Sequence, residues 1–165
     1  MERSTVARYA VGIAAAAALV LAAVAGAFAL ASPDLVLVVT TTESGDTVIE
    51  QPVANGTTVG LEYMHSVEKS RVYDGYTVRG QELVMTRMEF ESYGWGLPAR
   101  ANVTNENGTL VYDPPGSLSE LLVSPGDIAG HELHVGGRTY DLVDRADGSS
   151  VRITLQRRSM IDKLT

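Results

Sequence analysis

The chain has no cysteine among its 165 residues, so disulfide bonds cannot contribute to its stability. It also has little lysine, only Lys69 and Lys163, and its 20 carboxylates outnumber its 13 basic side chains. An acidic chain repels phosphate backbones, so we predict no nucleic-acid partner. Low lysine with excess acid occurs in salt-adapted proteins, and GC-rich coding gives the same preference for arginine. Both explanations stay open.

Charge is absent from the segment that runs from Tyr9 to Pro33, which is rich in alanine. A helix of this length exceeds the roughly 30 Å hydrocarbon core of a bilayer at about 1.5 Å per residue. Arg3 and Arg8 precede the segment and carboxylates follow it. Because basic flanks stay in the cytoplasm, we expect an N-terminus inside and a C-terminal domain outside.

These features predict a cytoplasmic segment at 1–8, a transmembrane anchor at 9–33 and an exported domain at 34–165. The chain would then be a single-pass protein of the cell membrane, in contact with the lipid bilayer through residues 9–33. The small residues of Ala29-Leu30-Ala31 also fit a signal-peptide cleavage site, and cleavage after Ala31 would release a secreted domain. Both outcomes stay open.

Three acceptor sequences for glycosylation agree with export, at Asn55, Asn102 and Asn107. Each of them is equally compatible with a polar turn.

Apolar residues of the exported part alternate with polar ones in short runs, which Gly, Pro, Asn and Asp separate. We predict strands at 35–41, 47–53, 58–65, 74–79, 82–90, 109–112, 132–135, 138–142 and 151–156. Residues 118–123 fit either a strand or a helical turn, and residues 144–148 fit a turn. Within the fifth strand, Val84, Thr86, Met88 and Phe90 are expected on one face. The prediction is an all-β fold, an antiparallel β-sandwich or barrel-like domain preceded by one N-terminal transmembrane helix.

The densest polar cluster follows the third predicted strand, and its candidate binding residues are His65, Ser66, Glu68 and Lys69. By the two-residue period, His65 continues the inward face of that strand. Such a cluster fits a ligand or partner site at the edge of the core. A core-edge histidine followed by a solvated turn is the alternative.

A second cluster contains the only tryptophan, Trp95, between two glycines. Tyr93 and Trp95 are candidate walls of a pocket, and Gly94, Gly96 and Pro98 are candidates for a structural loop. Glycine is suited to such a loop because it adopts positive φ and lets another backbone approach closely.

Enzyme and metal motifs are absent from the sequence. A Gly-x-Ser-x-Gly elbow, a P-loop and a dinucleotide fingerprint are missing. His131 and His134 lie three residues apart, and on a strand they point to opposite faces. We therefore predict no metal, no cofactor and no catalytic residue. A hydrolase that uses His65 as a general base is the least favoured alternative.

Three segments together resemble the family known as domain of unknown function 1850. Tyr63–Lys69 contains His-Ser-Val-x-Lys, Val72–Tyr76 is a tyrosine-containing strand, and Phe90–Pro98 has the spacing Phe-x-x-x-Gly-x-Gly-Leu-Pro. Many members have a small residue where this chain has Trp95. Members are often encoded beside TRAP-type transporters, particularly those with TAXI-type solute receptors, so the resemblance implies an accessory role in solute uptake.

The leading hypothesis is thus a membrane-anchored extracytoplasmic accessory domain of a TRAP-type transporter, whose partner is the permease or its solute receptor. A stand-alone module that binds a small molecule or an ion at the cell surface is the alternative.

Overall fold

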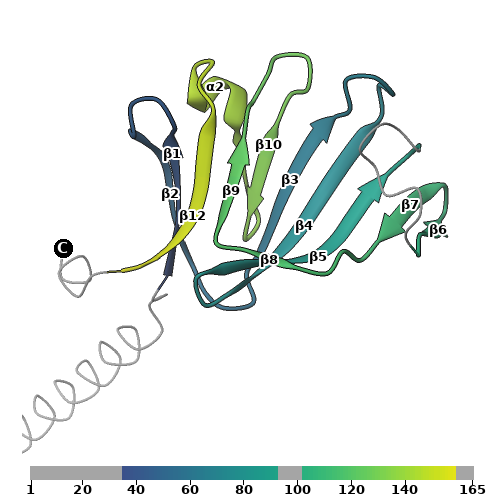
Figure 1. The fold of residues 1–165 in the computed structure, drawn as a ribbon, viewed down its shortest axis with the longest axis horizontal. Helices are drawn as coiled ribbons and strands as arrows, with labels where there is room; N and C mark the ends of the chain where they lie inside the picture. The colour runs from purple at the N-terminus through teal and green to yellow at the C-terminus, as the bar shows by residue number, and fades with distance from the viewer. Residues whose placement is uncertain (1–34, 93–101, 159–165) are drawn as a thin grey trace, which may run out of the picture. The chain divides into compact units, whose positions relative to one another are not determined.

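The computed structural model describes residues 35–92 and 102–158 (Figure 1). The predicted span at 9–33 and the candidate loop with Tyr93, Gly94, Trp95, Gly96 and Pro98 lie outside these residues. Across the described ranges, no helix has the length and apolar character that a membrane crossing requires.

Nearly all of the regular structure consists of β-strands. The elements are β1 (Leu35–Thr41), β2 (Thr47–Val53), β3 (Thr58–Met64), β4 (Arg71–Arg79), β5 (Glu82–Phe90), β6 (Thr104–Glu106), β7 (Thr109–Tyr112), β8 (Ser117–Leu118), β9 (Glu120–Val123), β10 (Glu132–Val135), β11 (Arg138–Asp141), α2 (Leu142–Ala146) and β12 (Val151–Arg157). The prediction of an all-β fold is confirmed.

The strands form two antiparallel sheets (Figure 1). The smaller sheet has the order β2-β1-β12-β9, and the larger has the order β11-β10-β3-β4-β5-β7-β6 with β8 beside β5. Tight turns join several neighbours, such as β1 to β2 and β4 to β5, because Gly adopts positive φ in them, as at Gly45 (φ 77°) and Gly80 (φ 60°).

One hydrophobic core lies between the sheets. The alternating residues Leu37 and Val39 of β1 and Ile153 of β12 contribute from the smaller sheet, and Val59 and Leu133 contribute from the larger, all fully buried. Two separate sheets that share a core correspond to the sandwich rather than the barrel.

A polar link also joins the sheets at one edge. The Tyr140 hydroxyl of β11 donates to Gln51 Oε1 of β2 at 2.7 Å, and Arg138 donates to the same oxygen at 3.0 Å.

A β-bulge in β5 corrects one prediction. Gly75 of β4 pairs with Arg87, whereas Tyr76 pairs with Met85, so Thr86 is an extra residue of β5 with no paired residue on β4. The inward face changes parity at this point, and Leu83 and Met85 pack in the core instead of Val84 and Thr86. The expected common face of Val84, Thr86, Met88 and Phe90 is therefore wrong.

The segment predicted as a turn at 144–148 is instead the end of a short helix and its cap. The Asp141 carboxylate accepts from the N–H groups of Val143 and Asp144 at 2.8 and 3.1 Å, which caps α2. Leu142 and Ala146 are buried, so packing against the core stabilises a helix too short to form alone.

Smaller differences concern strand boundaries. β3 ends at Met64, β4 begins at Arg71, and residues 117–123 form two short strands rather than a helical turn. The strand β6 was not predicted.

Candidate functional site

The turn between β3 and β4 holds the first group of candidate residues. The His65 N–H donates to the Ser70 carbonyl at 2.8 Å, and the Lys69 N–H donates to the His65 carbonyl at 2.9 Å. His65 Nδ1 accepts from the Glu68 N–H at 3.2 Å, and Lys69 adopts a φ of 54°. His65 thus continues the pairing of β3 with β4 by one residue and closes the turn.

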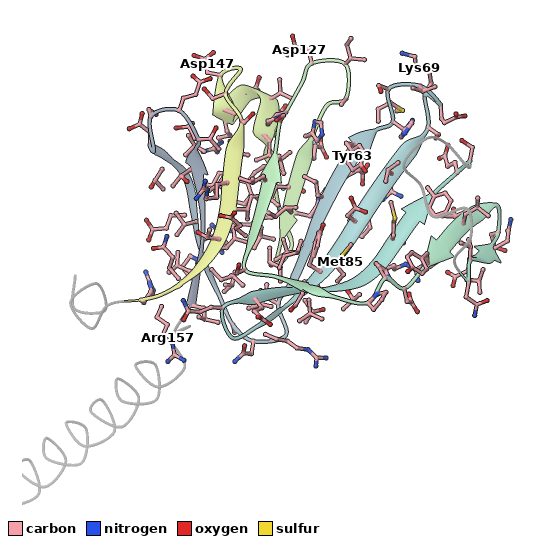
Figure 2. All side chains as sticks on the ribbon, in the orientation of Figure 1. Tyr63, Lys69, Met85, Asp127, Asp147 and Arg157 are labelled. Atoms are coloured by element: carbon pink, nitrogen blue, oxygen red, sulfur yellow. The ribbon has the colours of Figure 1, made fainter. Side chains whose placement is uncertain are left out.

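The remaining candidates in this turn point outward. Ser66, Glu68 and Lys69 are exposed, and Lys69 lies at the tip of the turn (Figure 2). These side chains are therefore accessible to a partner.

The end of β5 reaches the same turn. Ser70, which is buried, lies with its Oγ 3.4 Å from Ser92 Oγ, and the Ser92 hydroxyl donates to Glu68 Oε2 at 3.5 Å. Ser92 is the last described residue before the second candidate segment in the sequence. The contact with the first cluster is therefore established for Ser92 alone.

A groove opens next to the turn, where the loop between β9 and β10 meets the end of β3. The Met64 N–H donates to the Ala129 carbonyl at 2.7 Å and holds the loop in place. The groove has a volume of about 390 Å³ and is lined by Glu62, Tyr63, Met64, Arg71, Ile128, Ala129, Gly130 and Glu132. We call it the β3 groove.

Exposed apolar side chains gather at this end of the domain. In the described ranges the large hydrophobic side chains that are exposed are Met64, Val67, Leu122 and Ile128. Met64 and Ile128 line the β3 groove, and Val67 lies in the adjoining turn. Sequence reasoning missed these residues, although an apolar residue between polar neighbours in a turn, as in Ser66-Val67-Glu68, was the available signal.

Charged residues form the polar wall of the groove and continue across the larger sheet. Arg71 pairs with Glu62 at 2.9 Å and with Glu89 at 3.1 Å. Arg87 then pairs with Glu89 at 2.6 Å and with Glu106 at 2.8 Å. Hydrogen bonds from Arg87 and Arg71 lower the pKa of Glu89. These side chains are partly exposed, so each pair contributes roughly 0–1 kcal/mol to stability, and the network mainly orients the groups.

Tyr73 covers the sheet beside this wall. A Cβ at Gly60 would lie 2.4 Å from the Tyr73 ring, so only glycine lets the ring lie flat over β3. The Arg71 guanidinium lies 5.4 Å from the ring centroid.

A cluster of partly buried polar side chains, Tyr63, Asp74 and His131, which we call the buried cluster, lies on the inward face of the larger sheet. The Tyr63 ring stacks on His131 with centroids 5.2 Å apart, and the Tyr63 hydroxyl donates to the Asp74 carboxylate. Burial raises the pKa of Asp74 to about 6, although the hydrogen bond from Tyr63 opposes the shift. Burial and the Asp74 charge raise the pKa of Tyr63 to about 12.

His131 completes this cluster. Burial lowers its pKa, and its Nδ1 is buried without a hydrogen-bond partner in the described part of the chain. His134 faces the opposite side of the sheet, where Nδ1 lies 3.0 Å from the Thr139 hydroxyl, so the predicted opposite directions are confirmed. Groups with shifted pKa values often mark functional sites. Asp74 and Tyr63 were not among the candidate residues that the sequence suggested.

The three candidate glycosylation sites lie at the surface. Asn55, Asn102 and Asn107 are exposed, and Asn107 occupies the β6–β7 turn with a φ of 54°. The Asn55 side chain accepts from the Gly80 N–H at 2.6 Å, so it also supports the neighbouring hairpin.

The comparison with family models identifies the chain. The model described as domain of unknown function (DUF1850) matches residues 59–142, and the chain belongs to this family. The matched range includes the β3–β4 turn, the β9–β10 loop and every residue that lines the β3 groove. No curated protein and no solved structure matches the chain.

Proposed function

We propose that this DUF1850 member is a membrane-anchored extracytoplasmic accessory domain that docks a protein of a TRAP-type transporter, its permease or its solute receptor. The observation that supports docking is the clustering of exposed apolar side chains around the β3 groove. Of the four such side chains in the described residues, Leu122 of β9 alone neither lines the groove nor lies in the β3–β4 turn.

The groove has the composition of a protein-binding surface. Met64 and Ile128 supply an apolar floor and rim, and Arg71, Glu62 and Glu132 supply charged walls. Interfaces commonly combine an apolar centre with a polar rim. An apolar side chain of the partner would enter between Met64 and Ile128, with Val67 and Lys69 in contact at the margin.

The experiment compares V67E/I128E with a matched control, L122E. All three substitutions place a carboxylate on an exposed apolar position, and only the first pair lies beside the groove. Association is measured by co-purification from membranes that contain the transporter, and uptake is measured in the same cells. We expect V67E/I128E to reduce association and uptake by about tenfold or more, and L122E to change neither.

The motif turn is tested separately with H65A/K69A. Loss of His65 Nδ1 removes the acceptor of the Glu68 N–H, so the turn should loosen and docking should weaken. Unchanged association and uptake in this variant would remove the turn from the docking surface.

A second candidate function is a small-molecule or ion-binding module, and the buried cluster of Tyr63, Asp74 and His131 favours it. A carboxylate and an imidazole that face a common interior could hold a small polar ligand. Thermal-shift titration with organic acids and divalent cations is the test. A saturable shift that D74N abolishes would support this function over docking.

A further inference from the structure

The two ends of the domain carry opposite charge, and the chain joins the domain at the basic end. β1 begins at Leu35, which pairs with Arg157 of β12 and with Val53 of β2. The β2–β3, β4–β5 and β10–β11 turns lie at the same end, because Gln81 donates to the Leu155 carbonyl and Gly136 N–H donates to the Thr58 carbonyl.

Arginines gather at this end, which we call the basic end. Among the described residues, it holds four arginines and one carboxylate, Glu82; the arginines are Arg79, Arg138, Arg157 and Arg158. None of the four arginines forms an ion pair with another described residue. The remaining described arginines lie on the sheet faces or at the far end.

The far end is acidic. Its turns, loops and short helix carry six carboxylates and two basic side chains, Lys69 and Arg145, and Figure 2 shows Asp127, Asp147 and Lys69 there and Arg157 at the opposite end. The six carboxylates are those of Glu43, Asp46, Glu68, Asp127, Asp144 and Asp147. Within a chain of net charge −7, a segregated group of four arginines that form no ion pair with another described residue therefore needs a separate explanation.

From this arrangement we infer that the basic end binds an anionic lipid surface and holds the domain upright on the membrane, with the β3 groove directed away from it. The inference rests on the proposed function, because it requires the tether at residues 9–33. Between Pro33 and Leu35 the chain reaches at most about 7 Å. This is shorter than the Debye length of about 8 Å at physiological salt, so the arginines would lie within the field of the headgroups.

A groove along the outer face of the smaller sheet reaches the basic end and provides space for a headgroup there. It has a volume of about 270 Å³, with Gln156, Arg157 and Arg158 at the basic end and Thr40 and Thr47 at the far end. Glu50, which pairs with Val38, lies farther along the same groove. A phosphate would consequently be placed at the arginine end, away from Glu50.

The test uses the full chain in nanodiscs. Because the chain has no cysteine, a single probe can be placed at either end, with A54C at the basic end and D127C at the acidic end. Each carries a fluorophore, and the lipid headgroups carry a quencher. Discs of phosphatidylcholine are compared with discs that also contain phosphatidylglycerol.

We expect the A54C probe to be quenched about twofold more in the anionic discs, and the D127C probe to be unaffected. The difference should disappear in R79Q/R138Q/R157Q/R158Q. It should also disappear for the chain with all four arginines at high salt, which screens the charges and does not depend on correct folding of the quadruple variant.

Three results would overturn the inference in distinguishable ways. Release of the chain from the discs would refute the tether and this inference together. Retention of the chain with equal quenching in both lipid mixtures would refute the lipid contact alone. Equal quenching with A54C crosslinking to the permease in native membranes would assign the basic end to a protein partner instead.

Discussion

Replacement of Asp74 by Asn should stabilise the domain at neutral pH. Burial raises the pKa of this carboxyl from 3.8 to about 6, and in the folded state the only side chain that hydrogen-bonds to it is Tyr63 within the described residues. A shift of this size corresponds to about 3 kcal/mol, because each pKa unit is worth about 1.4 kcal/mol. Asn keeps an acceptor for the Tyr63 hydroxyl and carries no charge.

The stabilisation by D74N should depend on pH. Asp74 has a higher pKa in the folded than in the unfolded chain, so its favourable contribution to folding stability is fully present below pH 3.8, where the carboxyl is protonated in both states. It is lost as the pH rises through about 6. D74N and the unmutated chain should therefore have similar unfolding free energies near pH 4. D74N should be more stable by up to about 3 kcal/mol near pH 8.

Urea unfolding monitored by circular dichroism at a series of pH values measures this difference. D113N is the matched control, because Asp113 is exposed and its replacement should change stability by less than about 0.5 kcal/mol. A difference between D74N and the unmutated chain that does not vary with pH would refute the reasoning.

Two further predictions concern local contributions to stability. G60A should destabilise the domain by about 1 kcal/mol, because the new Cβ meets the Tyr73 ring. In a Y73A background the same change should be neutral or stabilising. Thermal unfolding of the four proteins measures the coupling between the two positions, and equal effects of G60A in both backgrounds would contradict the prediction. D141A should cost about 1 kcal/mol through loss of the α2 cap. Urea unfolding of D141A beside D127A, an exposed loop aspartate, separates capping from loss of charge.

Several strands could be predicted with their boundaries. Leu35–Thr41, Thr47–Val53 and Glu82–Phe90 agree with the structure at both ends. The first is a continuous apolar and β-branched run, the other two show hydrophobic periodicity, and turn residues flank all three. The bulge at Thr86 could not be found in this way, since one extra residue leaves the local composition unchanged. The five-residue helix α2 is too short to show a helical period and depends on burial of Leu142.

The candidate site could be predicted only in part. The His65–Lys69 turn was selected because its polar residues follow an apolar strand. The β3 groove was not predicted, because half of its lining residues lie in a segment distant in sequence from the other half. These residues are Ile128, Ala129, Gly130 and Glu132. The backbone hydrogen bond between Met64 and Ala129 that joins the two segments has no signal in the sequence. The buried cluster could not be predicted either, since the stacking of Tyr63 on His131 depends on the pairing of β3 with β10.

The central claim, that the β3 groove docks a transporter protein, is tested most directly by co-purification of the permease and solute receptor with V67E/I128E and with L122E. The account predicts that the first variant loses its partner while the second retains it, with both folded by circular dichroism. Retention of the partner by V67E/I128E, or equal loss in both variants, would contradict it.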